Sequence, residues 1–225
     1  MSIKAVIFDM NGTIVDDEPI HEAAMRKVCK ELGANLSHEE FREEYIGRPD
    51  TDCFKKIIKK HGINGVPVIE LVNKKFKEYI SLIHDSNTPE KLKVIPGAVE
   101  LIKKLSKSFR IALATGAHRD EALMVLDSFG LRDYFEAIVS AEDATKGKPD
   151  PEPYLLAAKR LGVKPKACVA IEDSPNGVHA AKHAKMYCIG FHNPSDNQDL
   201  SEADIEVNSL LDISGALIKK LGGDM

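Results

Sequence analysis

The chain has 225 residues, of which 43% are hydrophobic and 29% are charged, and its formal net charge is −4. This length is more than one minimal domain and less than two full ones, so we expect one core with one modest insertion. Acidic and basic residues are interspersed, which argues against a basic face for nucleic acid, and no apolar run reaches membrane-spanning length.

These features predict a soluble, cytoplasmic, globular protein that is a monomer or weak homodimer, with no nucleic-acid or membrane partner. The N-terminal apolar run is too short for a signal peptide. The cysteines are scattered and include no CxxC pair, so we expect buried, reduced thiols at Cys29, Cys53, Cys168 and Cys188.

The N-terminal part predicts a buried strand followed by a helical insertion. Lys4–Asp9 is a continuous apolar run that ends at a carboxylate, a pattern typical of a strand buried on both faces of a parallel sheet. From Glu18 to about Ser86 the apolar residues recur with the helical period. We therefore predict an α/β catalytic core from residues 1–16 and 90–225, and a small all-α cap domain from residues 17–89.

The rest of the chain alternates between helical and strand patterns. The expected elements in chain order are a helix at Val99–Leu105, a strand at Arg110–Ala114, a helix at Glu121–Phe129, a strand at Glu136–Val139, a helix at Tyr154–Leu161, a strand at Ala167–Ile171, a helix at Gly177–Ala184 and a strand at Met186–Gly190. Such a βα repeat with right-handed crossovers predicts a doubly wound, Rossmann-like parallel sheet. Ligands bind such sheets at the carboxyl ends of the strands.

Polar residues follow several of these strands and supply the groups that phosphoryl transfer requires. Asp9 offers a carboxylate nucleophile, and Lys148 offers a cation that neutralises charge on the transferring group. Thr115 ends a strand just before a helix, so its hydroxyl and the amides of Gly116 and Ala117 are candidates for binding phosphate oxygens.

A magnesium site is predicted at the same edge of the sheet. Asp9 and Asp173, with help from Glu172, could hold Mg²⁺, which prefers one or two carboxylates together with water and substrate phosphate. Each motif alone has a structural explanation; Asp173-Ser174-Pro175, for example, also reads as the start of a helix. Their conjunction, each after its own strand, favours the catalytic interpretation.

At these motifs the sequence resembles the haloacid dehalogenase-like hydrolase superfamily, in particular the helical-cap group that contains β-phosphoglucomutase and small sugar-phosphate phosphatases. Phe8–Val15 matches the first family motif, Thr115 the second, Lys148 the third and Glu172-Asp173 the fourth. The resemblance implies a phosphoaspartyl intermediate on Asp9, a magnesium ligand in the backbone carbonyl of residue 11, and a flap around residues 13–17.

One residue departs from the family pattern. The resemblance implies an aspartate acid–base two residues after the nucleophile, and this chain has Asn11 there. An amide neither protonates a leaving alkoxide nor activates water, and losing a general acid–base typically costs about 10²–10⁴ in rate. Asn11 could be an engineered trap, a native feature of a lineage with another base, or a sign of phosphate binding without turnover. Because Asn-Gly pairs are prone to deamidation, slow conversion to aspartate is a further hypothesis.

Three cap residues are candidates for substrate contact. His21 lies at the start of the first cap helix and could replace the missing base, although it also reads as an exposed helical histidine. Gly47 and Arg48 belong to a loop that resembles the family's specificity loop. The arginine could pair with a second phosphate or a carboxylate, or it could be a solvated loop residue.

The sequence thus predicts an Mg²⁺-dependent phosphatase or phosphomutase of a small phosphorylated metabolite, such as a sugar phosphate. The acidic pair Glu172-Asp173 argues against a halide-displacing enzyme, and Arg48 in place of a cap lysine argues against a phosphonate-cleaving one. The alternative from another class is a regulatory, non-catalytic protein that binds a phosphorylated metabolite.

Overall fold

The computed structural model describes residues 2–46, 48–85, 92–194 and 198–223. The chain divides into two compact units, a core unit made of Met1–Asp16 and Val94–Met225 and a helical cap unit made of Asp17–Lys93. The second predicted domain boundary, between residues 89 and 90, lies outside the described residues.

Within the described residues, the core unit contains a 6-stranded sheet with strand order β5-β4-β1-β6-β7-β8. Every neighbouring pair is parallel. The strands are β1 (Ala5–Phe8), β4 (Arg110–Ala114), β5 (Ala137–Val139), β6 (Cys168–Glu172), β7 (Tyr187–Phe191) and β8 (Ile205–Val207). The predicted Rossmann-like sheet is confirmed.

The first strand occupies the centre of this sheet. Phe8 of β1 pairs with Leu113 on one side and with Ile171 on the other. Each of its four residues is fully buried, which explains why β1 reads as an uninterrupted apolar run rather than an alternating one. The carboxyl ends of β4 and β6 therefore flank the residues that follow β1.

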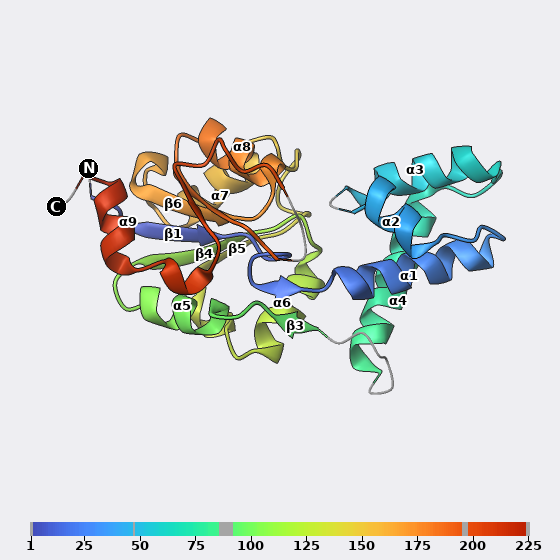
Figure 1. Cartoon of the computed structure of the whole chain (residues 1–225), viewed down its shortest axis with the longest axis horizontal. Helices are drawn as coiled ribbons and strands as arrows, with labels where there is room; N and C mark the ends of the chain where they lie inside the picture. The colour runs from blue at the N-terminus through green and yellow to red at the C-terminus, as the bar shows by residue number, and fades with distance from the viewer. Residues whose placement is uncertain (1, 47, 86–91, 195–197, 224–225) are drawn as a thin grey trace. The chain divides into compact units, whose positions relative to one another are not determined.

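Helices cover both faces of the sheet, as Figure 1 shows. Helices α7 and α8 lie on one face, where α7 contacts β1, β4 and β5 while α8 contacts β6 and β7. Helices α5 and α6 lie on the opposite face. The bounds in the core unit are α5 (Ala98–Leu105), α6 (Arg119–Ser128), η1 (Arg132–Tyr134), α7 (Glu152–Arg160), η2 (Pro165–Ala167), α8 (Pro175–His183), η3 (Leu210–Asp212) and α9 (Gly215–Leu221).

Apart from Lys93 of β3, the regular structure described in the cap unit is helical. It contains α1 (Glu18–Glu31), α2 (His38–Glu44), α3 (Asp50–His61) and α4 (Val68–His84), and α1 packs on α4. The unit has its own apolar core, which includes Val28, Phe41, Phe54 and Leu71. At the passage between the units, β2 (Val15–Asp16) and β3 (Lys93–Val94) pair as a separate two-stranded sheet.

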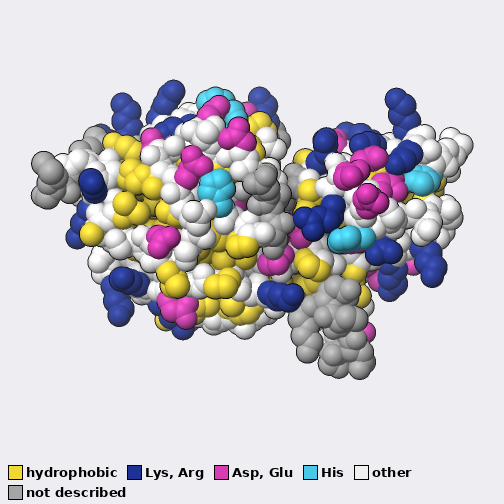
Figure 2. All heavy atoms as spheres, viewed as in Figure 1, with side chains coloured by type: hydrophobic (Ala, Val, Ile, Leu, Met, Phe, Trp, Pro, Cys, Tyr) yellow, Lys and Arg dark blue, Asp and Glu magenta, His cyan; other side chains and the backbone are white. Residues whose placement is uncertain are grey.

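The surface carries charges of both signs. Figure 2 shows Lys, Arg, Asp and Glu side chains interspersed over the face that it displays. Among the residues that the structure describes, no helix is both long and apolar enough to cross a membrane. As predicted, Cys29, Cys53, Cys168 and Cys188 are buried and form no disulfide.

Candidate active site

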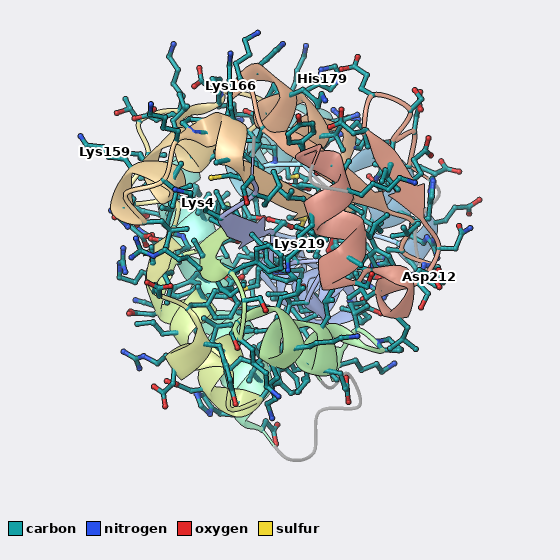
Figure 3. The ribbon with its side chains drawn as sticks, turned by 90° about the vertical axis from the view of Figure 1, so that its left-hand side faces the viewer. Lys4, Lys159, Lys166, His179, Asp212 and Lys219 are labelled. Atoms are coloured by element: carbon teal, nitrogen blue, oxygen red, sulfur yellow. The ribbon has the colours of Figure 1, made fainter. Side chains whose placement is uncertain are left out.

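Asp9 directly follows the central strand. Its backbone N–H donates to the carbonyl of Ile171 at 3.0 Å, and the residue is only 7% exposed. Figure 3 shows the amino-terminal edge of the sheet, with Lys4 just before β1, so Asp9 lies at the opposite edge. The next residues form a tight turn, because the carbonyl of Met10 accepts from the N–H groups of residues 13, 14 and 15.

A half-buried lysine, Lys148, reaches the Asp9 carboxylate from another loop. The Nζ of Lys148 lies 2.5 Å from Asp9 Oδ1, and it also donates to Glu172 Oε1. Glu172 is the last residue of β6 and is fully buried. The structure thus brings together the predicted nucleophile, the predicted cation and one member of the predicted acidic pair.

Asp173, the second residue of the predicted acidic pair, contacts the turn that follows Asp9. Thr13 Oγ1 donates to Asp173 Oδ1 at 3.1 Å. Gly12 has a φ of +80°, and a Cβ at this position would lie 1.9 Å from Asp173 Oδ2. Glycine is therefore required here both by the left-handed backbone and by the close approach of the carboxylate.

The environments of Asp9 and Asp173 oppose the ionisation of these two carboxylates. Burial, together with the charge of Glu172, raises the pKa of Asp9 to about 7 although Lys148 acts in the opposite direction. Burial and the charges of Asp9 and Glu172 raise the pKa of Asp173 well above its usual value. Burial lowers the pKa of Lys148, but the two neighbouring carboxylates outweigh it and leave that pKa above its ordinary value.

These residues fit a hard divalent cation. Asp9, Glu172 and Asp173 each offer a carboxylate oxygen, and these oxygens all lie within 4.8 Å of one another. Three carboxylates face one lysine, so the cluster has an excess of negative charge when it is ionised. Oxygen donors and excess negative charge are what Mg²⁺ prefers, whereas soft metals prefer sulfur and imidazole ligands.

The predicted phosphate-binding threonine lies beside Asn11. Thr115 follows β4 and is 2% exposed. Its hydroxyl accepts a hydrogen bond from the Ala117 amide at 3.0 Å and donates to Asn11 Oδ1 at 3.4 Å. Gly116, which lies between Thr115 and Ala117 in the chain, is exposed. The amide oxygen of Asn11 is thus directed at Thr115, and the other group of this amide is a hydrogen-bond donor.

Two supporting residues were not predicted. Asn193 Nδ2 donates to the carbonyl of Gly12 at 3.0 Å. Asn193 follows β7, so inspecting the end of that strand would have identified it. Tyr154, on α7, donates from its hydroxyl to Glu172 Oε1 at 2.6 Å. Tyr154 does not follow a strand. It is one of several residues on the buried side of a helix, so the sequence pattern does not single it out.

The cap candidates belong to the other unit and are described separately. His21 is not an exposed helical histidine: its ring stacks on Tyr79 with centroids 4.3 Å apart, and its Nε2 lies 3.2 Å from Asp17 Oδ2. Its Nδ1 lies 2.6 Å from the Nζ of the buried Lys75. Arg48 is exposed between α2 and α3. Gly47 lies outside the described residues.

The fold and this arrangement define a Rossmann-like α/β enzyme with an inserted helical cap. A family model described as "Haloacid dehalogenase-like hydrolase" matches residues 6–191. The chain therefore belongs to the haloacid dehalogenase-like hydrolase family, as its motifs predicted.

Similarity to individual proteins narrows the class of enzyme within this family. The chain is 34% identical over 217 residues to hexitol phosphatase B of Escherichia coli (strain K12), covering 94% of this chain and 95% of that protein. It is 31% identical over 221 residues to β-phosphoglucomutase of Bacillus subtilis (strain 168), covering 96% and 94%. The crystal structure of β-phosphoglucomutase from Clostridium difficile is 28% identical with a TM-score of 0.81, covering 99% and 98%. The chain is an enzyme of this phosphatase and mutase class, which confirms the prediction.

Proposed function

We propose that the protein catalyses Mg²⁺-dependent transfer of a phosphoryl group from a small phosphorylated carbohydrate to Asp9, as a phosphatase or a phosphomutase. The observation that carries this proposal is the buried Asp9 carboxylate, which lies 2.5 Å from the Lys148 ammonium and within 4.8 Å of an Asp173 oxygen. The names of the relatives, a hexitol phosphatase and β-phosphoglucomutases, support the carbohydrate phosphate as substrate class.

In this proposal Asp9 attacks the phosphorus, so that a carboxylate O–P bond forms while the bond to the leaving oxygen breaks. In the same proposal Lys148 neutralises charge on the transferring group, and Thr115 binds phosphate oxygens. Asp9, Asp173 and the Asn11 carbonyl, with Glu172 as a further ligand, would hold Mg²⁺, which would supply the positive charge that lets a carboxylate approach a phosphate dianion.

Asn11 determines which half of the reaction is slow. Its NH₂ group can donate a hydrogen bond to an oxygen of the substrate, but it cannot transfer a proton to the leaving alkoxide. Donors with good leaving groups should therefore phosphorylate Asp9, whereas attack of water or of a sugar hydroxyl on the acyl phosphate should be slow. We propose that the protein, as it stands, is an attenuated phosphotransferase.

The test is a measurement of phosphate release and of covalent Asp9 phosphorylation. Acetyl phosphate and an aryl phosphate serve as donors with good leaving groups, and hexitol phosphates and β-glucose 1-phosphate serve as candidate substrates. Asp9→Ala is the blank. A phosphorylated Asp9 peptide that needs Mg²⁺ and is missing from the blank supports the proposal. Unmodified Asp9 with every donor would contradict it.

Magnesium is expected to stabilise the protein more at pH 7.5 than at pH 5.5. The folded-state pKa of Asp9 is raised to about 7, against about 4 in an unfolded chain, so folding favours the protonated form. This contribution to stability is fully present below about pH 4 and is lost as the pH rises to about 7. Metal binding needs the ionised carboxylates, so it replaces the lost stability only at the higher pH.

Thermal denaturation with and without Mg²⁺ at the two pH values measures this effect, and Asp173→Asn is the control that should weaken the response. An Mg²⁺-induced rise in Tm that is equal at both pH values would show that protons and metal do not compete at this cluster.

The second candidate function is regulatory binding of a phosphorylated metabolite without turnover, and Asn11 is the observation that favours it. Under this alternative, phosphate and phosphorylated sugars raise Tm while neither product nor phosphorylated Asp9 accumulates over long incubation. Mg²⁺-dependent turnover of any phosphate ester would exclude it.

A further inference from the structure

Tyr154 lies directly behind the cation of the candidate site. It is fully buried on α7 and belongs to a large cluster of buried apolar residues that includes Ala157 and Val178. Its hydroxyl donates to Glu172 Oε1 at 2.6 Å. The Nζ of Lys148 lies 5.2 Å from the centroid of the Tyr154 ring. One side chain therefore contacts both the cation and the carboxylate that the cation binds.

The Glu172 carboxylate is held from both sides. Its Oε1 accepts from Tyr154 and from Lys148, whereas its Oε2 accepts from the Ser174 hydroxyl at 3.1 Å and from the Ser174 N–H at 3.4 Å. A Cβ at Gly177 would lie 1.9 Å from Glu172 Oε1, so α8 can approach this closely only because residue 177 is glycine. These contacts fix the direction of the oxygen that Lys148 binds.

We propose that Tyr154 is a positioning residue for the reaction, which holds Lys148 toward Asp9 through its hydroxyl on Glu172 and through its ring. The inference rests on the proposed function, in which Lys148 neutralises the transferring phosphoryl group. Two physical effects act together. The hydroxyl orients the carboxylate that binds the ammonium, and the negative face of the ring attracts the ammonium itself.

The hydroxyl and the ring can be separated by substitution. Tyr154→Phe keeps the ring and removes the hydrogen bond to Glu172, whereas Tyr154→Leu removes both. Leu161→Val is the matched control, because Leu161 lies two turns further along in the same apolar cluster and is equally buried. The control weakens packing without touching Glu172 or Lys148.

The first readout is the reactivity of Lys148 toward limiting acetic anhydride, measured by peptide mass spectrometry without any substrate. Lys159 is the internal standard, because it is an exposed lysine of the same helix that points away from the protein (Figure 3). Tyr154→Phe removes a hydrogen bond to the charged Glu172, which then holds the Lys148 ammonium less firmly. We therefore expect the Lys148-to-Lys159 labelling ratio to rise about tenfold in Tyr154→Phe. It should rise further in Tyr154→Leu and stay unchanged in Leu161→Val.

The second readout is turnover in an Asn11→Asp background. Tyr154→Phe should lower kcat about tenfold while KM changes by less than about threefold, because the misplaced ammonium mainly affects the transition state. Leu161→Val should leave both constants near those of the parent.

The two readouts separate the inference from the function on which it rests. Unchanged Lys148 labelling in Tyr154→Phe would overturn the inference whatever the turnover shows. Raised labelling with an unchanged kcat would also overturn it, because Lys148 would then move without consequence for the reaction. Unmodified Asp9 with every donor, both in this chain and in Asn11→Asp, would defeat the proposed function, and the labelling ratio would still decide whether Tyr154 holds Lys148.

Discussion

Asn11→Asp is expected to raise steady-state phosphate release by about 10²–10⁴-fold, which corresponds to a barrier lower by about 3–5.5 kcal/mol. The Asn11 oxygen accepts from Thr115, so the group directed away from Thr115 is an NH₂ that carries no transferable proton. A carboxyl group in its place can protonate the leaving oxygen and then activate water. The measurement is kcat/KM for an aryl phosphate and for hexitol phosphates in the presence of Mg²⁺.

The size of the gain should depend on the leaving group. Poor leaving groups need protonation, so the gain should be largest for sugar phosphates and smallest in the phosphorylation step with acetyl phosphate. Asn11→Gln is the control, because it changes shape without adding an acid. Equal turnover by the parent and by Asn11→Asp would mean that another group supplies the proton. Peptide mapping that finds aspartate at position 11 in active parent samples would assign the parent's activity to deamidation.

Lys148→Met is expected to abolish turnover and to lower the free energy of unfolding by about 3–5 kcal/mol at pH 7.5. The ammonium lies between the buried residues Asp9 and Glu172, and removing one partner of such a cluster leaves buried charge without compensation. The loss should be smaller at pH 5.5, because Asp9 then takes up a proton and becomes neutral. Urea denaturation at the two pH values measures the difference.

Lys159→Met is the matched control, since an exposed lysine contributes little to stability. Saturating Mg²⁺ should restore part of the lost stability to Lys148→Met at pH 7.5, because the metal replaces the missing positive charge. A Lys148→Met protein as stable as the parent at pH 7.5 would mean that Asp9 and Glu172 do not rely on the lysine for charge compensation.

Much of the fold could be predicted because its strands are buried on both faces and are separated by amphipathic helices. The predicted strand Arg110–Ala114 is β4 without any change of bounds, and the other predicted core strands differ by one residue at one or both ends. Elements with weak signals were missed. β8 has only three residues, and α9 is a seven-residue helix that follows a short loop. The helical insertion was predicted as a whole, without a separation of α2 from α3.

In the candidate site, the residues that directly follow strands were the ones that the fold made predictable. Asp9, Thr115 and Asp173 all follow strands, so topology alone places them at one edge of the sheet. Lys148 lies in a loop, and its partners are set by the path of that loop rather than by any local pattern. The contacts of Tyr154 and Asn193 depend on side-chain packing between segments distant in the chain, which periodicity does not encode.

The pairing of β2 with β3 has a consequence for how this enzyme can diversify. Ile95 donates from its N–H to the carbonyl of Ile14 at 2.8 Å, so the two points where the core chain is interrupted are hydrogen-bonded neighbours. Neighbouring strands lie about 4.8 Å apart, a gap that a short turn can bridge. The path of the core chain is therefore continuous at this point without the inserted segment, and helical inserts of other lengths and sequences can be exchanged at this position. Such an exchange leaves Asp9, Lys148 and Asp173 in place, because all three belong to the core unit.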